Sequence, residues 1–211
     1  LAIADILGST EGGMGQSIMT KDTPASETAK FTLLPVAKVL LPDGSREVVP
    51  GSGEVGMVAQ GGMVPLGYYK DPEKSAKTFK EVDGKRYAFI GDMATVEADG
   101  TINLLGRGSN CINTGGEKVF PEEVEEALKL HTDVADALVF GLEDERFGNR
   151  VAGVVSLEKG GTAEAGDILE ATRKLLASYK LPKDLLVVPV VPRAPNGKAD
   201  YKSAKSMMAD G

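Results

Sequence analysis

The chain has 211 residues, of which 42% are hydrophobic and 26% are charged, and its formal net charge is −7. This composition is typical of a globular protein with one or two modest cores, and it excludes a disordered tail. The acidic balance argues against a nucleic-acid or anionic-membrane surface, because such partners select clusters of lysine and arginine, and here the two signs of charge are interleaved.

The single cysteine, Cys111, allows no internal disulfide framework and no cysteine-rich zinc site, which indicates a reducing, cytoplasmic compartment. No apolar run approaches the roughly 18 residues that a membrane span requires, so we expect no integral membrane segment. The chain starts at Leu1 without a basic leader or an initiator methionine, and we interpret this start as a cut through a longer protein.

The N-terminal half of the chain predicts strands and loops. Residues 36–49 are rich in apolar and β-branched side chains around the turn at Asp43 and Gly44, and they predict a hairpin. Residues 54–60 predict another strand, because a short apolar run lies between glycines.

The next elements are a short helix and a second hairpin. Asp71 followed by proline indicates a capped helix over residues 72–79. Residues 87–96 and 102–105, joined through an Asp-Gly turn, predict two paired strands. Residues 1–106 are therefore expected to be β-rich and loop-heavy.

The pattern changes at the glycine-rich polar stretch 106–110, which we take as a domain boundary. Residues 121–130 predict an amphipathic helix, with an apolar stripe and glutamates near the end where the helix dipole favours anions.

The remaining segments predict a small α+β domain. Residues 134–142 and 150–157 predict strands joined by a polar connection, and residues 185–191 predict a further short strand. Between them, a helix is expected to start after Thr162 or Asp167 and to end at Leu181-Pro182.

The first motif with chemical potential is the glycine turn that runs from Gly8 to Gly13, directly after an apolar strand. Its backbone N–H groups and the hydroxyls of Ser9 and Thr10 suit a phosphate, and Glu11 suits the Mg²⁺ that accompanies it. On its own the motif is also compatible with a purely structural turn.

Two further positions have a functional and an ordinary interpretation. Asp92, at a strand end beside Gly91, suits the two hydroxyls of a ribose, but it is also a common surface aspartate. Lys198 projects from the tight turn Pro195-Asn196-Gly197, where most lysines are simply solvated.

Together, and in this order, these motifs resemble the adenylate-forming superfamily of acyl-CoA synthetases, peptide-synthetase adenylation domains and luciferases. The segments that carry the resemblance are GSTE, GEVGMVAQGGMVPLGYYKDPEKSAKTF, IGDM, GRGSNCINTGGEKVFPEEVEEAL and PNGK. They cover nearly the whole chain, and the GGEKVFPEEVE version is more similar to acyl-CoA ligases than to peptide-synthetase domains.

The fold that the resemblance implies is α+β. Residues 1–106 would form the β-rich C-terminal part of the large AMP-binding domain, and residues 107–211 a small mobile C-terminal domain. The resemblance places a hinge directly after Arg107, where Ser109 replaces the usual Asp or Lys. Leu7 likewise stands where the family often has an adenine-stacking Tyr.

The resemblance implies a two-step reaction in which ATP activates a carboxylate and the acyl-adenylate is passed to CoA. Gly8, Ser9 and Thr10 would contact the nucleotide phosphates, and Glu11 would bind Mg²⁺. Asp92 would hold the ribose hydroxyls with help from Arg107.

Lys198 is implied to reach the α-phosphate and the substrate carboxylate during adenylation. The segment from Asn113 to Glu117, with Gly115 and Gly116, is implied to line the pantetheine channel during thioester formation. The family's phosphate loop would lie upstream of Leu1, so we expect the chain alone to be inactive or nearly so.

The leading hypothesis is therefore an acyl-CoA ligase for a fatty, steroid-derived or aromatic carboxylate, with ATP, Mg²⁺ and CoA. One alternative is an enzyme that passes the acyl-adenylate to a carrier-protein thiol. The other is a non-catalytic nucleotide-binding module that has kept the fold.

Overall fold

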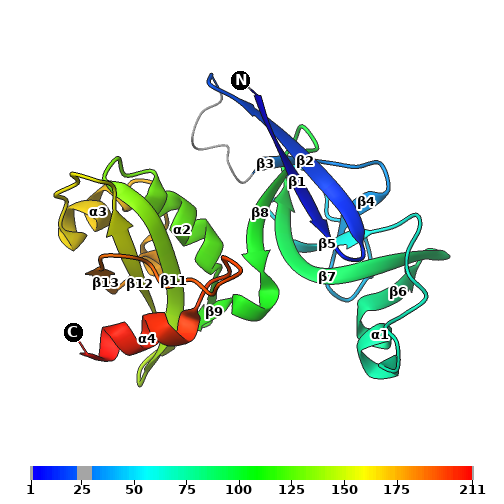
Figure 1. The fold of residues 1–211 in the computed structure, drawn as a ribbon. Helices are drawn as coiled ribbons and strands as arrows, with labels where there is room; N and C mark the ends of the chain where they lie inside the picture. The colour runs from blue at the N-terminus through cyan, green and yellow to red at the C-terminus, as the bar shows by residue number, and fades with distance from the viewer. Residues whose placement is uncertain (1, 23–29, 211) are drawn as a thin grey trace. The chain divides into compact units, whose positions relative to one another are not determined.

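The computed structural model describes residues 2–22 and 30–210, and the chain divides into two compact units between Ser109 and Asn110 (Figure 1). The first unit comprises Leu1–Ser109 and the second comprises Asn110–Gly211. Across the described ranges, no helix is both long enough and apolar enough to span a membrane.

The described part of the first unit is built on an eight-stranded sheet in which every pairing is antiparallel. The strand order is β1-β2-β3-β8-β7-β5-β4, with β6 paired to β7. The strands are β1 (Ala2–Ser9), β2 (Gly12–Thr20), β3 (Lys30–Leu33), β4 (Ala37–Leu40), β5 (Gly56–Gln60), β6 (Phe79–Val82), β7 (Lys85–Val96) and β8 (Ile102–Arg107).

The core of the first unit forms where apolar side chains from these strands meet. Met14, Val39, Val58 and Ile102 are at most 1% exposed and belong to one cluster. Their neighbours Leu40 and Ala59 belong to a second buried cluster with Phe89, as expected when side chains alternate between the two faces of a strand. Burial of these apolar side chains fixes the register of β7 and β8, the two strands that carry candidate site residues.

The helix of the first unit, α1 (Pro72–Thr78), confirms the capped helix expected after Asp71. The Asp71 carboxylate accepts a hydrogen bond from the Lys74 N–H at 3.0 Å, which satisfies one of the unpaired N–H groups of the first turn. The hairpin of β7 and β8 is confirmed as well, and β7 is longer than the sequence indicated.

The hairpin predicted over residues 36–49 is confirmed as a chain reversal, although its second arm forms no strand of its own. The Leu41 N–H donates to the Arg46 carbonyl and the Val48 N–H to the Val39 carbonyl, each at 2.9 Å, and a bridge joins Leu40 to Glu47. The strand β4 also pairs with β5. The second arm is short because the chain turns toward β7 after Val49, where the Gly51 N–H donates to the Val96 carbonyl (2.8 Å).

The second unit contains a three-stranded sheet in the order β11-β12-β13 and a separate two-stranded pair of β9 and β10. β11 and β12 are antiparallel, whereas β12 and β13 are parallel. The elements are β9 (Ile112–Thr114), β10 (Glu117–Val119), α2 (Pro121–Lys129), β11 (Val134–Asp144), β12 (Gly148–Leu157), α3 (Ala165–Thr172), β13 (Asp184–Val187) and α4 (Tyr201–Asp210), with 3₁₀ turns at Gly108–Asn110 and Ser178–Lys180.

Both faces of the three-stranded sheet are covered, which explains the nearly unbroken apolar runs in β11 and β12. Ala137 and Val139 face a cluster that includes residues of α2 and α3, whereas Leu138 and Phe140 face the cluster that contains Ala204 of α4. The β11–β12 hairpin is thus the buried centre of the second unit (Figure 1).

The helix expected to run to Leu181 is shorter, and its predicted C-terminal half is wrong. The helix α3 ends at Thr172, where the buried Thr172 hydroxyl donates to the Ile168 carbonyl at 2.8 Å. Leu175 and Tyr179, which lie in that predicted half, are 53% and 42% exposed. The exposed side chains gain too little burial to hold further helical turns.

The C-terminal helix α4 was not predicted from the sequence. Its signals are local and were available: the Asp200 carboxylate accepts from the Ser203 N–H at 3.1 Å, as an N-cap does. Tyr201, Ala204 and Met208 then recur at helical spacing and pack into one cluster.

Substitution of a buried residue of α2 should lower the free energy of unfolding far more than substitution of an exposed residue. The Leu128 side chain is fully buried, so Leu128→Ala should lower the free energy of unfolding of the second unit by about 2–5 kcal/mol. Leu175→Ala is the matched control, because that side chain is 53% exposed and its loss should change the free energy by about 0.5 kcal/mol or less. Urea unfolding measures both, and equal losses would contradict this assignment of the core.

Candidate functional site

The glycine turn joins β1 to β2, and its two hydroxyls contact Glu11. The Glu11 N–H donates to Ser9 Oγ at 3.2 Å, and Thr10 Oγ1 donates to Glu11 Oε2 at 2.9 Å. The pairing of β1 with β2 shifts register between Leu7 and Gly8, directly before these residues. The turn therefore orients an acidic group as well as offering hydroxyls to a ligand.

Tyr68 provides the other contact to Glu11, and sequence reasoning missed it. The Tyr68 hydroxyl donates to Glu11 Oε1, and this bond is the main reason that the pKa of Glu11 falls from 4.5 to about 2. The same bond raises the pKa of Tyr68. Glu11 is therefore ionised at neutral pH, as a ligand for a divalent cation must be.

Tyr68 is positioned by the N-terminal end of α1. Its N–H donates to Ser75 Oγ at 2.8 Å, and the Ser75 hydroxyl in turn donates to the Asp71 carbonyl at 2.6 Å. The centroids of the Tyr68 and Phe79 rings lie 5.2 Å apart, and Lys74 Nζ lies 4.0 Å from the centroid of the Tyr68 ring. The signal in the sequence is the pair of tyrosines before the helix cap.

Asp92 and Arg107 are directly opposite each other on β7 and β8. Arg107 Nε lies 2.9 Å from Asp92 Oδ1, and Arg107 Nη1 donates to the Ile90 carbonyl at 3.0 Å. The register of the two strands shifts between Met93 and Ala94, and such irregularities re-aim the side chains beside them. The structure thus places Arg107 beside Asp92, the two residues that the resemblance assigns to the ribose.

Burial sets the electrostatics of this pair. The Asp92 side chain is 14% exposed and that of Arg107 is 53% exposed. Burial raises the pKa of Asp92, and the Arg107 charge opposes that rise. The Arg107 charge also opposes the rise in the pKa of Tyr68. Gly8, Ser9, Thr10, Glu11, Asp92 and Arg107 all belong to the first unit.

In the second unit, Gly115 and Gly116 form the tight turn between β9 and β10. Their φ angles are +60° and +92°, a backbone conformation that suits glycine. The Gly115 N–H donates to the Phe147 carbonyl at 2.9 Å, and Asn149 Nδ2 donates to the Asn113 carbonyl at 3.3 Å. This turn is therefore fastened to the connection between β11 and β12, with Glu117 exposed beside it.

Lys198 lies in a second turn of the same unit, and its side chain is exposed. The Lys198 N–H donates to Asn196 Oδ1 at 3.2 Å, and Arg193, at the base of the turn, pairs with Asp136 near the start of β11. The Lys198 turn and the Gly115–Gly116 turn are thus fastened at opposite ends of the β11–β12 hairpin.

The residues around Glu11 fit a single magnesium ion that arrives with a nucleotide. Mg²⁺ takes one or two carboxylates and completes its shell with phosphate oxygens and water. Glu11 offers one ionised carboxylate, beside the Thr10 hydroxyl. In the part of the chain that the structure describes, no group of three or more His, Cys, Asp or Glu side chains could hold a metal by itself.

The Tyr68–Glu11 bond should be visible in a titration. Tyr68→Phe should raise the pKa of Glu11 from about 2 toward 4.5, because the donated hydrogen bond is lost. Because the pKa of Glu11 is lower in the folded protein, its ionised carboxylate stabilises the fold. This stabilisation is fully present above pH 4.5 and is lost as the pH falls through about 2. Carboxyl-carbon NMR of Glu11 measures the pKa.

Tyr69→Phe is the control for that titration, because the neighbouring Tyr69 side chain is 88% exposed. It should leave the pKa of Glu11 unchanged. The same low pKa in both variants would show that Tyr68 is not the cause.

Residues 123–198 match the family model of the AMP-binding enzyme C-terminal domain. The chain is 48% identical over 206 residues to a 3-oxocholest-4-en-26-oate–CoA ligase of Rhodococcus rhodochrous, a match that covers 96% of the chain and 37% of that ligase. It is also 48% identical to a medium/long-chain-fatty-acid–CoA/3-oxocholest-4-en-26-oate–CoA ligase of Mycolicibacterium smegmatis, over 97% of the chain and 37% of the relative. The chain thus spans just over a third of the length of these relatives.

Solved structures are similar to the chain over almost its whole length. The structure of apo MatB from Rhodopseudomonas palustris is 28% identical and superposes with a TM-score of 0.77, over 98% of this chain and 41% of MatB. That of the amide bond synthetase McbA from Marinactinospora thermotolerans is 25% identical, with a TM-score of 0.81 over 97% of this chain and 42% of McbA.

Proposed function

The chain belongs to the adenylate-forming superfamily of AMP-binding enzymes, and we propose that it is the C-terminal part of an ATP-dependent acyl-CoA ligase. The observation that carries the proposal is that the candidate residues are distributed over both units. Glu11, Asp92 and Arg107, which suit a nucleotide, lie in the first unit, and the cation Lys198 lies in the second. The proposal assigns residues 1–106 to the large domain and residues 107–211 to a small mobile one.

The proposed reaction has two steps. First, a carboxylate oxygen bonds to the α-phosphorus of ATP and the bond to the bridging oxygen breaks, which releases pyrophosphate and leaves an acyl-adenylate. Second, the sulfur of CoA bonds to the acyl carbon, AMP leaves with the bonding electron pair, and the thiol proton is released. Catalysis of the first step depends on positioning and on charge stabilisation around the phosphorus.

The residues of the first unit would bind and orient ATP. The Asp92 carboxylate would accept hydrogen bonds from the ribose hydroxyls, and the Arg107 charge beside it opposes the rise in its pKa that burial causes. The turn from Gly8 to Thr10 contacts the phosphates, and Glu11 binds the Mg²⁺, which offsets phosphate charge when bound. Tyr68 holds Glu11 in the orientation that this contact needs.

The two turns of the second unit would serve the two steps in succession. Lys198 places a positive charge at the α-phosphate during adenylation, and the Gly115–Gly116 turn with Glu117 borders the pantetheine of CoA during thioester formation. Because these turns are fastened at opposite ends of the β11–β12 hairpin, we propose that the unit rotates between steps. The pivot would lie near Ser109, where the two units divide.

The substrate class follows from the relatives that share almost half of their aligned residues with the chain. Two of them are named for fatty-acid or cholestenoate CoA ligation, so we propose a fatty or steroid-derived carboxylate as the acyl substrate. The partners are then ATP, CoA and that acid, and the proposed location is the cytoplasm.

Lys198 gives the first test of the function. In the complete ligase, Lys198→Ala should slow ATP–pyrophosphate exchange by about 10²–10³-fold, the usual loss when one preorganised charge is removed. It should still convert a supplied acyl-adenylate to the CoA thioester. Lys159→Ala, which removes another exposed lysine of the same unit, is the control and should keep both activities. Equal exchange in wild type and Lys198→Ala would refute the mechanism.

Asp92 gives a test of nucleotide recognition. Asp92→Asn should weaken ATP binding by about 10-fold or more, because hydrogen bonds to a charged group contribute about 1.5–3 kcal/mol. Wild type should discriminate against 3′-deoxy-ATP, whereas Asp92→Asn should bind both nucleotides alike. Asp5→Asn, an exposed aspartate of the first unit, is the control. Calorimetric titration measures each affinity, and unchanged discrimination in Asp92→Asn would place the ribose elsewhere.

A further inference from the structure

The turn that carries Lys198 is closed by its own backbone. The Ala194 N–H donates to the Lys198 carbonyl at 2.8 Å, and Arg193 and Ala199 form an isolated antiparallel bridge. Residues 192–200 are therefore a small closed loop, and we call them the lysine loop. A contact that fixes the base of the lysine loop also fixes the point from which Lys198 projects.

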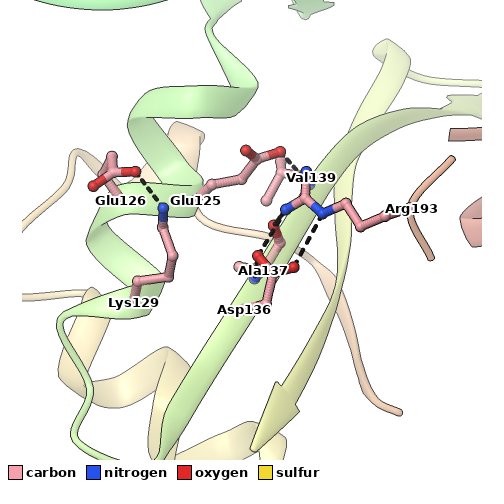
Figure 2. Close-up of polar contacts among 7 residues, drawn as sticks. All are labelled: Glu125, Glu126, Lys129, Asp136, Ala137, Val139 and Arg193. Carbon is pink, nitrogen blue, oxygen red and sulfur yellow. Dashed lines mark hydrogen bonds and ion pairs between the residues drawn. The ribbon is translucent and has the colours of Figure 1, made fainter. Parts of the chain in front are cut away.

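Arg193, at that base, is fastened to the edge strand β11. Its Nε lies 3.0 Å from Asp136 Oδ2 and its Nη2 lies 2.7 Å from Asp136 Oδ1, and Nη2 also donates to the Ala137 carbonyl at 3.3 Å (Figure 2). Two parallel bonds between planar groups fix direction as well as distance, which a lysine in the same place could not do. The Asp136 and Arg193 side chains are each 34% exposed, so the pair is partly withdrawn from water.

The helix α2 adds a second fastening at the same edge. Glu125 Oε1 accepts a hydrogen bond from the Val139 N–H at 2.8 Å, two residues after the carbonyl that Arg193 contacts (Figure 2). Burial raises the pKa of Glu125 to about 7, and the Arg193 charge opposes that rise. The next acid along the helix, Glu126, is paired with Lys129 instead.

We propose that Arg193 is a positioning residue for Lys198, which it holds through its fork on Asp136. The lysine loop then has one orientation on β11, and the cation of Lys198 projects from a fixed point when the acyl-adenylate forms. Arg193 acts through the loop, because its guanidinium is directed at β11. The inference rests on the adenylation role proposed for Lys198 and extends it to the residues that aim it.

The test compares variants that keep charge or shape but lose the fork. In the complete ligase, Arg193→Lys and Asp136→Asn should slow ATP–pyrophosphate exchange by about 10–10²-fold, since misplacement of a catalytic group by about 1 Å can cost that much. KM for ATP and thioester formation from a supplied acyl-adenylate should be unchanged. Arg173→Lys is the matched control, because the Arg173–Glu170 pair lies on the surface of the same unit.

Two measurements distinguish a positioning role of Arg193 from a general effect on stability. Hydrogen exchange at the Ala194 amide, which closes the lysine loop, should be faster in Arg193→Lys and unchanged in Arg173→Lys. The double variant Asp136→Asn with Arg193→Lys should be no slower than either single variant, because both substitutions break the same contact.

The outcomes distinguish the positioning role of Arg193 from the adenylation role proposed for Lys198. If Lys198→Ala loses exchange while Arg193→Lys and Asp136→Asn keep it, the aiming role is wrong and the function stands. If both fork variants lose the two half-reactions equally, Arg193 is only structural and the inference is also wrong. If Lys198→Ala itself keeps exchange, the proposed function fails and the aiming role fails with it.

Discussion

The antiparallel pairing of β7 with β8 is the constraint on which the candidate nucleotide site depends. It sets Asp92 opposite Arg107, and the buried carboxylate needs that cation because a buried charge without a partner is costly. The same strand β8 ends at Arg107, two residues before the division between the units. A change in the register of this hairpin would therefore disturb the ion pair and the start of the second unit together.

The second unit places two short turns on one rigid frame. Its central hairpin is buried on both faces, so the hairpin cannot bend without opening one of two clusters. The Gly115–Gly116 turn is fastened near Phe147, and the lysine loop is fastened near Asp136. A rigid body with different chemistry at its two ends is what an enzyme with two successive half-reactions can use, and the proposed rotation needs no rearrangement inside the unit.

Much of the fold was predictable where the signal was local. The cap at Asp71, the hairpin of β7 and β8 and the helix α2 are confirmed, because each depends on residues next to one another in the chain. The length of α3 was not predictable, because the helix ends at Thr172, after which side chains become exposed, and does not continue to Pro182. The short strand β6 was missed although its pairing is local, since it forms a hairpin with the start of β7 across the turn at Asp83 and Gly84.

The candidate site was only partly predictable from the sequence. The motifs pointed to Glu11, Asp92, Arg107 and Lys198 one by one, but Tyr68 reaches Glu11 across 57 residues of sequence. The Asp136–Arg193 fork spans the same separation and has no motif of its own. The roles assigned to these residues stay predictions until the half-reactions are measured.

The edge of β11 also affects how readily the protein would aggregate. An apolar strand at the border of a sheet invites pairing with another chain, and the run from Ala137 to Phe140 is wholly apolar. Here the Ala137 carbonyl accepts from Arg193 and the Val139 N–H donates to Glu125, so polar side chains occupy the hydrogen-bonding groups that an added strand would use. Arg193 and Glu125 would thus also protect this strand edge against aggregation.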